Sequence, residues 1–148
     1  MYKKLFIFGI IFLWIDQLSK GLIIIYINVN ESIKIFDFLS LTYVHNMGAA
    51  FSMLSGARWL FIILAIIALN IIYIYFIKDK NLSNFEIVTY ALLLSGIIGN
   101  LIDRILYGYV IDFIDVTIFD FAIFNLADSF IVISVILLLL GVKKWSTK

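Results

Sequence analysis

Two aspartates, Asp112 and Asp128, are the strongest candidates for chemistry in this chain, because both lie among apolar residues. A carboxylate at membrane depth costs at least about 2.5 kcal/mol on insertion scales, so it is a candidate functional group by default. Two carboxyl groups in contact hold one proton between them. The ionised group can then activate a water molecule while the protonated group donates to a carbonyl oxygen. This pattern indicates hydrolysis of a peptide bond at the outer face of a membrane.

Spacing alone leaves other interpretations open. Asp16, Asp103 and Asp115 are rival partners in a carboxylate pair. The main alternative is a small ion or proton transporter with Asp16, Asp103 and Asp128 as relay groups. A transporter requires a continuous row of polar residues that reaches the cytoplasmic side. The apolar segments have few polar residues there. A structural subunit without chemistry leaves the clustering of Asn and Asp unexplained.

Composition places the chain in the membrane. Hydrophobic residues make up 64% of its 148 residues and charged residues 14%, against roughly half and about a quarter in a soluble domain. There is no cysteine and only one histidine, which excludes disulfides, thiolate chemistry and a structural zinc site. A net charge of +1 without a basic tract gives no reason to expect a nucleic-acid partner.

Four apolar stretches have the length that a membrane-spanning helix needs. The first is interrupted by Asp16 and Lys20 and has no small-residue cleavage site, which favours a retained helix over a signal peptide. We therefore expect an all-α membrane protein that forms a single domain. Its transmembrane helices are predicted at about 5–27, 59–77, 87–106 and 121–142.

Helical spacing predicts which polar groups meet. Asp16 and Lys20 are four residues apart, so they share a helix face and can pair inside the bundle. In the third helix, Gly96, Gly99, Asn100 and Asp103 lie on one face, where the glycines allow a neighbouring helix to pack closely. In the fourth, Asn125 lies three residues before Asp128 and can donate to the site.

The segment between the first two helices differs in pattern. Partial alternation over 33–44 predicts one or two strands, and non-helical backbone cannot face lipid, so residues 28–57 should cap the bundle. Gly48, Ala49 and Ala50 suit a tight turn, and His45 is expected to be a solvated loop residue. The stretch 107–120 is predicted to be a loop.

Basic residues predict the orientation. Seven lysines flank the start of the first helix, the second connection and the end of the fourth helix: Lys3, Lys4, Lys78, Lys80, Lys143, Lys144 and Lys148. The other connections carry only Lys34 and Arg58. By the positive-inside rule both termini are cytoplasmic, so residues 28–57 and the aspartate loop share the outer face.

Five segments, in order, resemble motifs of the lipoprotein signal peptidase (signal peptidase II) family of bacterial membrane aspartyl proteases. They are D-Q-x-x-K at 16–20, N-x-G-A-A-F at 46–51, G-N-x-x-D-R at 99–104, V-x-D-F at 110–113 and F-N-x-A-D-S at 124–129. One departure is Ser95, where the family often has glycine. Serine is also small, so we expect a slight packing change and no loss of activity.

The resemblance implies a four-helix fold with a small extracytoplasmic sheet that cradles the substrate. It implies Asp112 and Asp128 as the catalytic dyad. It also implies residues that bind substrate or orient the site: Asp16, Lys20, Asn46, Gly48, Asn100, Asp103, Arg104 and Asn125. The substrate would be a prolipoprotein with a diacylglyceryl-cysteine, cleaved just before that cysteine at the outer face of the bacterial cytoplasmic membrane. No metal or cofactor is expected, and cyclic peptides of the globomycin type are expected inhibitors.

Overall fold

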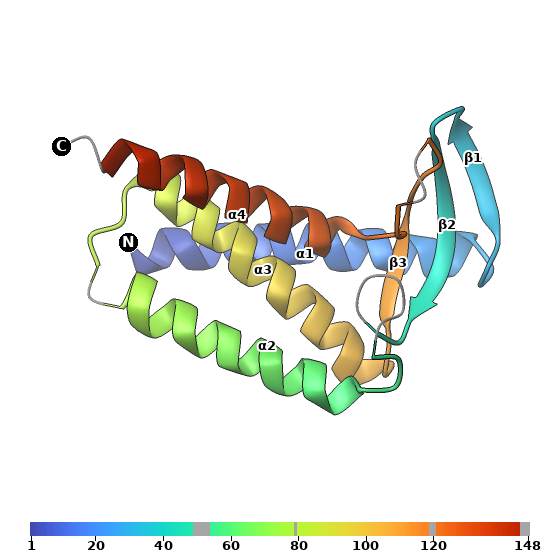
Figure 1. Cartoon of the computed structure of the whole chain (residues 1–148), viewed down its shortest axis with the longest axis horizontal. Coiled ribbons are helices and arrows are strands. Elements are labelled where there is room, and N and C mark those ends of the chain that lie inside the picture. Colours follow the sequence, from blue (N-terminus) through green and yellow to red (C-terminus); the bar gives the residue numbers. More distant parts are fainter. Residues whose placement is uncertain (49–53, 79, 119–120, 146–148) are drawn as a thin grey trace.

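A computed structural model describes residues 1–48, 54–78, 80–118 and 121–145, and the side chains within them up to residue 141. The helices are α1 (Tyr2–Tyr26), α2 (Arg58–Ile72), which continues as the π-helical turn η2 (Tyr73–Ile77), α3 (Asn84–Leu106) and α4 (Leu126–Trp145). The strands are β1 (Ser32–Phe36), β2 (Leu39–Asn46) and β3 (Val110–Val116). Figure 1 shows the sheet at one end of the helices, while the start of α1 and the end of α4 lie at the other.

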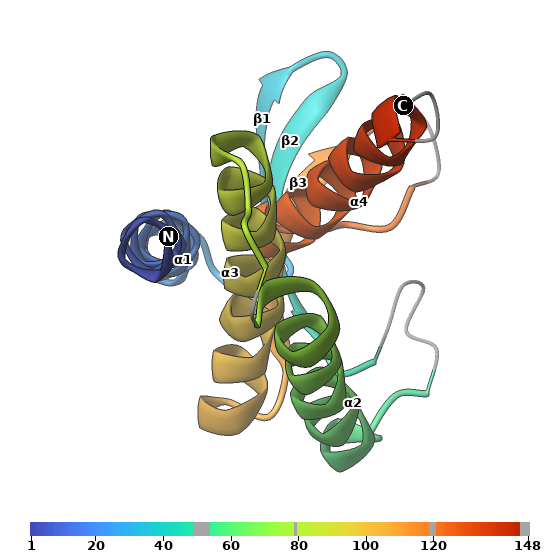
Figure 2. The same cartoon turned by 90° about the vertical axis from the view of Figure 1, so that its left-hand side faces the viewer.

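Helix α3 is the centre of the bundle and contacts α1, α2 and α4 (Figure 2). Its expected small-residue face is confirmed. A Cβ atom built on Gly96 would lie 2.5 Å from the Ala127 carbonyl oxygen of α4, and one on Gly99 would collide with the Asp16 carboxylate of α1. Ser95 is buried beside this face. The two glycines therefore bring α1 and α4 against the same turns of α3.

Three of the described helices are long and apolar enough to cross a membrane: Tyr2–Tyr26, Arg58–Ile77 and Asn84–Leu106. They agree with the predicted ranges to within three residues. Helix α3 begins earlier than expected, because Ser83 and Glu86 form a capping box that holds its first turn. The fourth apolar segment, Leu126–Gly141, is shorter.

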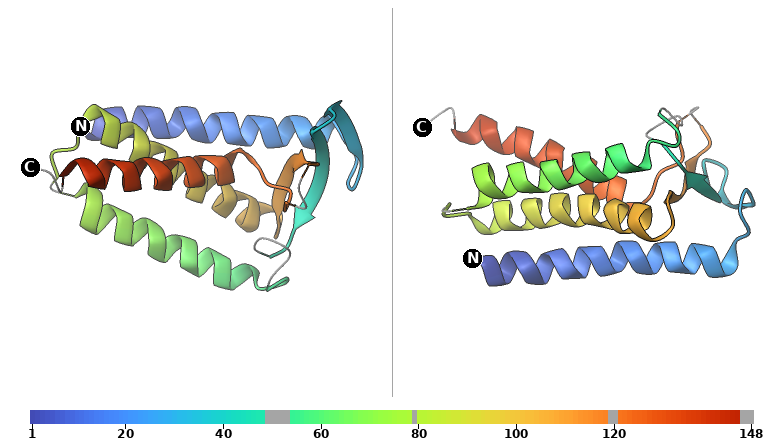
Figure 3. Two further views of the ribbon diagram at one scale, coloured as in Figure 1. Left: turned by 45° about the horizontal axis from the view of Figure 1, so that its top comes forward. Right: turned by 90° about the horizontal axis from the view of Figure 1, so that it is seen from below.

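The sheet has three antiparallel strands in the order β1-β2-β3. One or two strands were expected within 28–57, and two are present, but the prediction of a loop over 107–120 was wrong because Val110–Val116 is the third strand. Its Ile111 pairs with His45 of β2, and its Ile111 and Phe113 join a buried cluster with Ile23 of α1. Burial of these side chains stabilises the strand. The polar residues of this stretch had led us to predict a loop. Figure 3 shows the sheet lying across the end of α1.

Helix α4 begins five residues later than predicted, at Leu126 instead of 121. Phe124 forms an isolated bridge with Ile114 of β3, and backbone hydrogen bonds run in both directions between them. The backbone at Phe124 therefore pairs with the sheet edge, so the helix begins only after it.

His45 is not the solvated loop residue that we expected. It lies in β2, its ring stacks on Tyr109 with centroids 3.7 Å apart, and its Nε2 is 3.0 Å from the Tyr43 hydroxyl. Burial lowers the pKa of His45, so the neutral ring is favoured there. Its ring contacts therefore lie within β2 and in the turn that leads into β3. The proposed turn at Ala49 and Ala50 lies outside the described residues.

Candidate active site

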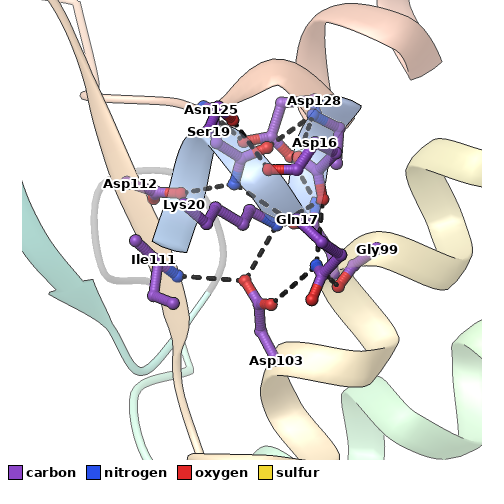
Figure 4. A network of polar contacts seen from close by, with 12 residues as sticks. Asp16, Gln17, Ser19, Lys20, Gly99, Asp103, Ile111, Asp112, Asn125 and Asp128 are labelled. Carbon is purple, nitrogen blue, oxygen red and sulfur yellow. Dashed lines mark hydrogen bonds and ion pairs between the residues drawn. The ribbon is translucent and has the colours of Figure 1, made fainter. Parts of the chain in front are cut away.

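Asp112 and Asp128 reach the same site from different elements, one on β3 and the other in the first turn of α4 (Figure 4). Asn125 links them. Its side-chain amide donates to Asp112 Oδ1 over 2.7 Å, and its backbone N–H donates to Asp128 Oδ2 over 3.2 Å. The two carboxyl groups, sixteen positions apart in sequence, therefore share a hydrogen-bond partner.

Asp128 is held by the start of its own helix. The Asp128 backbone N–H donates to Asn125 Oδ1 over 2.9 Å, while the Asp128 carboxylate accepts the Asn125 N–H. This reciprocal arrangement is a capping box with Asn125 as the N-cap residue. Asp128 is the third helical residue, whereas the predicted start at 121 would have placed it about seven residues into the helix, which was wrong. At a helix N-terminus the helix dipole favours a negative charge on its carboxylate.

Asp112 is only 2% exposed, and two amides hold its carboxyl group. Asn46 of β2 donates to Oδ2 over 2.8 Å and Asn125 donates to Oδ1. Burial, together with the charge of Asp128, raises the pKa of Asp112 from 3.8 to about 7, although both hydrogen bonds act in the opposite direction. Near neutral pH this carboxyl group therefore retains a proton for part of the time.

A second set of charges lies directly behind the pair. Lys20 of α1 is 3.0 Å from Asp16 Oδ2 and 2.8 Å from Asp103 Oδ2 of α3, and all three side chains are almost fully buried. The predicted pairing of Asp16 with Lys20 is confirmed. Asp16 also accepts the Ala127 N–H of α4 over 2.9 Å, and Asp103 accepts the Ile111 N–H of β3 over 3.2 Å. This ion-paired cluster ties α1 and α3 to the two segments that carry the catalytic candidates.

Asn100 connects the two sets. Its Oδ1 accepts from Lys20 Nζ over 3.0 Å and from Asn125 over 3.1 Å, and its amide donates to Asp128 Oδ1 over 2.7 Å. The charge of Lys20 polarises the Asn100 amide and strengthens its bond to the Asp128 carboxylate. A cation thus acts on the site without touching either of its carboxylates.

Gln17 is the residue that the sequence analysis did not assign to the site. Its side-chain amide donates to Asp16, to Asp103 and to the Gly99 carbonyl oxygen, at 3.1 to 3.3 Å. Its place in the D-Q-x-x-K motif was the available signal. Gln17 donates to Asp103 Oδ1, which Lys20 does not contact, and shares Asp16 Oδ2 with Lys20.

Arg104 and Gly48 form the rim of the site. Arg104 Nη2 donates to the Gly48 carbonyl oxygen over 3.1 Å, and its guanidinium lies 4.8 Å from the ring centre of Phe61. The Gly48 N–H donates to Asn46 Oδ1 over 2.9 Å, which orients the Asn46 amide toward Asp112. All ten residues of the predicted site are therefore brought together by the described structure.

The pair of aspartates opens into a cavity of about 710 Å³. Its polar wall is formed by the site residues, and most of the rest is apolar. The lining residues are Asn46, Gly48, Phe61, Asn100, Arg104, Val110, Asp112, Phe121, Ala122, Ile123, Phe124, Asp128, Ser129, Val132 and Ile133. A space of this size, with aliphatic and aromatic walls and carboxyl groups at one side, suits an apolar ligand with a polar reacting group.

Within the described residues, no group of three or more His, Cys, Asp or Glu side chains is arranged to hold a metal ion. The donor set consists of two carboxyl groups, and burial raises the pKa of Asp112 to about 7. A strand and an apolar helix carry this pair, and amides hold it. The fold and the site therefore define a membrane aspartyl peptidase.

Comparison with known proteins identifies the family. A model of signal peptidase (SPase) II matches residues 8–143. A lipoprotein signal peptidase of Streptococcus agalactiae serotype V is 41% identical over 140 residues, which cover 93% of this chain and 90% of the relative. One from Halothermothrix orenii is 42% identical over 136 residues, or 91% and 92% of the two chains. The chain belongs to the signal peptidase II family.

Solved structures agree with this. A bacterial membrane enzyme structure at 2.3 Å resolution is 38% identical, with a TM-score of 0.87 over 95% of this chain and 87% of the other. A second, at 1.9 Å resolution, has a TM-score of 0.84, covers 93% and 91% of the two chains and is also 38% identical. The arrangement of helices and sheet is thus shared with experimentally determined membrane enzymes.

Proposed function

We propose that this protein is the endopeptidase that removes the signal peptide from diacylglyceryl-modified prolipoproteins, with Asp112 and Asp128 as its catalytic dyad. The observation that carries the proposal is the pair itself: two carboxyl groups joined through Asn125 at the wall of an apolar cavity. Membership of the signal peptidase II family supplies the substrate class.

The two aspartates take different roles. Asp128, at the N-terminus of α4 and bonded to the amide that Lys20 polarises, is the ionised member and takes a proton from the attacking water. Asp112, with a pKa raised to about 7, is the protonated member and donates to the carbonyl oxygen of the scissile bond. As the tetrahedral intermediate breaks down, Asp128 passes the proton taken from water to the leaving amine, and Asp112 takes a proton back from a hydroxyl of the intermediate as the carbonyl group re-forms. The dyad returns to one proton shared between two carboxyl groups.

The cavity suits a lipid-modified peptide. Its apolar wall includes Phe61 of α2 with Val132 and Ile133 of α4, side chains that can pack against acyl chains. The diacylglyceryl group holds the scissile bond at the membrane surface, and this fixed orientation accounts for a large part of the rate enhancement. Asn46 and Arg104, at the polar rim, orient the peptide backbone near the dyad.

The same arrangement argues against a proton or ion transporter. Such a protein needs Asp16 and Asp103 to exchange protons with the dyad, but both are tied to Lys20 and to backbone N–H groups. Because their oxygens already accept from Lys20 and from these N–H groups, neither carboxyl group is free to pass a proton to the dyad.

In the membrane, α1 to α4 are four spans, with both termini in the cytoplasm and the sheet and dyad at the outer face. The lysines near the start of α1 and in the α2–α3 connection lie at the end of the bundle opposite the sheet (Figure 1). This distribution supports the orientation by the positive-inside rule. The whole chain forms one membrane domain.

The decisive experiment is incubation of the purified protein with a diacylglyceryl-modified prolipoprotein. We expect a shorter mature lipoprotein on a gel, and mass spectrometry should place the cleavage immediately before the lipidated cysteine. Globomycin should block the shift. An unmodified prolipoprotein with the same sequence is the matched control and should be cleaved far more slowly. Equal cleavage of both substrates, or no cleavage of either, contradicts the proposal.

A further inference from the structure

Most of the surface of helix α2 does not pack against the rest of the described chain. Of the three long apolar helices it has the smallest buried share, 11% of its most apolar window. Its main contact with another long helix is with α3, and Figure 2 shows it at the edge of the bundle. The buried Ile62 and the cavity residue Phe61 lie on its inner side. The described residues on its opposite side are exposed.

That outer side carries a heptad pattern. Leu60, Ile63, Ile67, Asn70 and Ile74 follow one another at alternating intervals of three and four residues, and we refer to them as the α2 seam. All five are exposed, the four apolar ones between 42% and 54%. Residues at this spacing form one stripe along a helix, which is the pattern by which two parallel helices pack.

Asn70 is the unusual member of the α2 seam. It lies twelve residues after Arg58 and seven before Ile77, which places it roughly 18 Å from one end of the span and about 10 Å from the other. Its side-chain amide donates to the Ile66 carbonyl oxygen over 2.8 Å. Among the described residues no group donates to its Oδ1, so a strong acceptor points away from the bundle at hydrocarbon depth.

We propose that the α2 seam is a self-association surface, on which α2 of a second copy packs in parallel and the two Asn70 amides hydrogen-bond to each other. An amide is both donor and acceptor, so it is its own complement in a symmetric pair. All copies insert with the same orientation, which makes their α2 helices parallel and brings identical seam positions together. A single Asn among apolar seam residues is a known determinant of register in parallel helix pairs.

This surface is compatible with an active site in each copy. Phe61 faces the cavity, whereas the α2 seam lies on the opposite side of the helix, so pairing leaves the dyad accessible. The inference requires only that α2 spans the membrane and does not depend on the proposed peptidase activity.

Disulfide cross-linking tests the geometry, because the chain has no cysteine of its own. Ile67→Cys in the α2 seam should give a dimer on oxidation in liposomes. Ile10→Cys, on α1 and 49% exposed, is the matched control and should remain monomeric. Equal cross-linking of the two variants, or none at position 67, overturns the proposal.

Energy transfer between dye-labelled copies in liposomes tests the role of the amide, with a single cysteine introduced at the exposed Ser55. Asn70→Leu should weaken association by about 3- to 30-fold, the range expected for one interhelical hydrogen bond in a membrane. Asn70→Gln should retain more of the association than Asn70→Leu. Prolipoprotein cleavage should be unchanged in both, which shows that they fold. No transfer in the unsubstituted protein, or equal transfer with Asn70→Leu, overturns the proposal.

Discussion

Two groups of buried aspartates lie side by side at the end of the bundle that carries the sheet, and they differ in the groups that pair with their carboxylates. Asp16 and Asp103 share the ammonium group of Lys20 and also accept hydrogen bonds from Gln17 and from the backbone. Asp112 and Asp128 accept hydrogen bonds from amides, and no described cation forms an ion pair with either.

The difference shows how one residue type serves two purposes. Asp16 and Asp103, paired with Lys20, hold helices together. Asp112 has only amide donors and lies beside a second carboxyl group, and its raised pKa allows it to act as a proton donor. The two groups meet at Asn100, which accepts from Lys20 and donates to Asp128. The ion-paired group therefore acts as the rigid support of the reactive group.

The largest expected effect comes from removing charge from the reactive group. Asp112→Asn or Asp128→Asn should reduce prolipoprotein cleavage by at least about a thousandfold, because the amide can neither activate water nor donate the required proton. Cleavage in isolated membranes measures this. Asp115→Asn is the matched control on the same strand. The Asp115 carboxylate accepts a hydrogen bond from Thr42 instead of facing the dyad, and its loss should leave cleavage within a few-fold of normal. Full activity in either dyad variant would remove that residue from the mechanism.

Removing the cation of the ion-paired group should affect stability most. Lys20→Met leaves Asp16 and Asp103 buried without a counter-charge, which typically costs about 3–5 kcal/mol. Thermal or denaturant unfolding in detergent measures the loss. Lys34→Met breaks an exposed pair with Asp37, at 2.7 Å, and should cost less than about 1 kcal/mol. A Lys20 variant as stable as the Lys34 variant would show that this cluster does not support the fold.

The raised pKa of Asp112 predicts a pH dependence of activity. Cleavage should fall about tenfold per pH unit above about pH 7, since the proton that Asp112 donates is lost there. The same pKa shift predicts how the free energy of unfolding depends on pH. The raised pKa of Asp112 stabilises the folded state fully below about pH 4, and this stabilisation is lost as the pH rises to about 7. Initial rates and unfolding midpoints between pH 5 and 9 measure both. A flat rate profile across pH 7 would contradict the assignment of the proton to Asp112.

The smallest expected effect tests whether Asp112 holds the proton that is donated. Asn46 donates to Asp112 Oδ2 and favours its ionised form, so Asn46→Ala should move the alkaline limb of the rate profile to higher pH. Thr42→Ala is the matched control on the same strand, because Thr42 bonds Asp115 instead. If both variants shift the limb equally, the hydrogen bond from Asn46 does not tune the dyad.

Much of this site could be predicted from helical spacing. The Asp16–Lys20 pair follows from a four-residue interval, and the small-residue face of α3 follows from the positions of Gly96 and Gly99. The start of α4 could also have been found. Asn125 and Asp128 have the N-x-x-D spacing of a capping box, a local signal that predicts a helix beginning at Leu126, whereas the apolar run alone predicted 121.

The third strand could not be found in this way. Val110–Val116 contains two aspartates, which favoured a loop, although its valines, isoleucines and phenylalanine are typical of a strand. It becomes a strand because β2 offers a free edge and because Ile111 and Phe113 are buried against α1. His45 was misjudged for the same reason, since its stacking partner Tyr109 comes from a distant part of the chain.

The sequence by itself therefore determined the membrane class, the apolar spans and the candidate residues for the chemistry, because these depend on composition and on short intervals along a helix. Only the tertiary structure decided which aspartates formed a buried ion-paired cluster and which formed the proposed dyad. That choice depends on which side chain reaches the single Lys20 ammonium group, and residues from α1, α3, β3 and α4 reach that point only after folding.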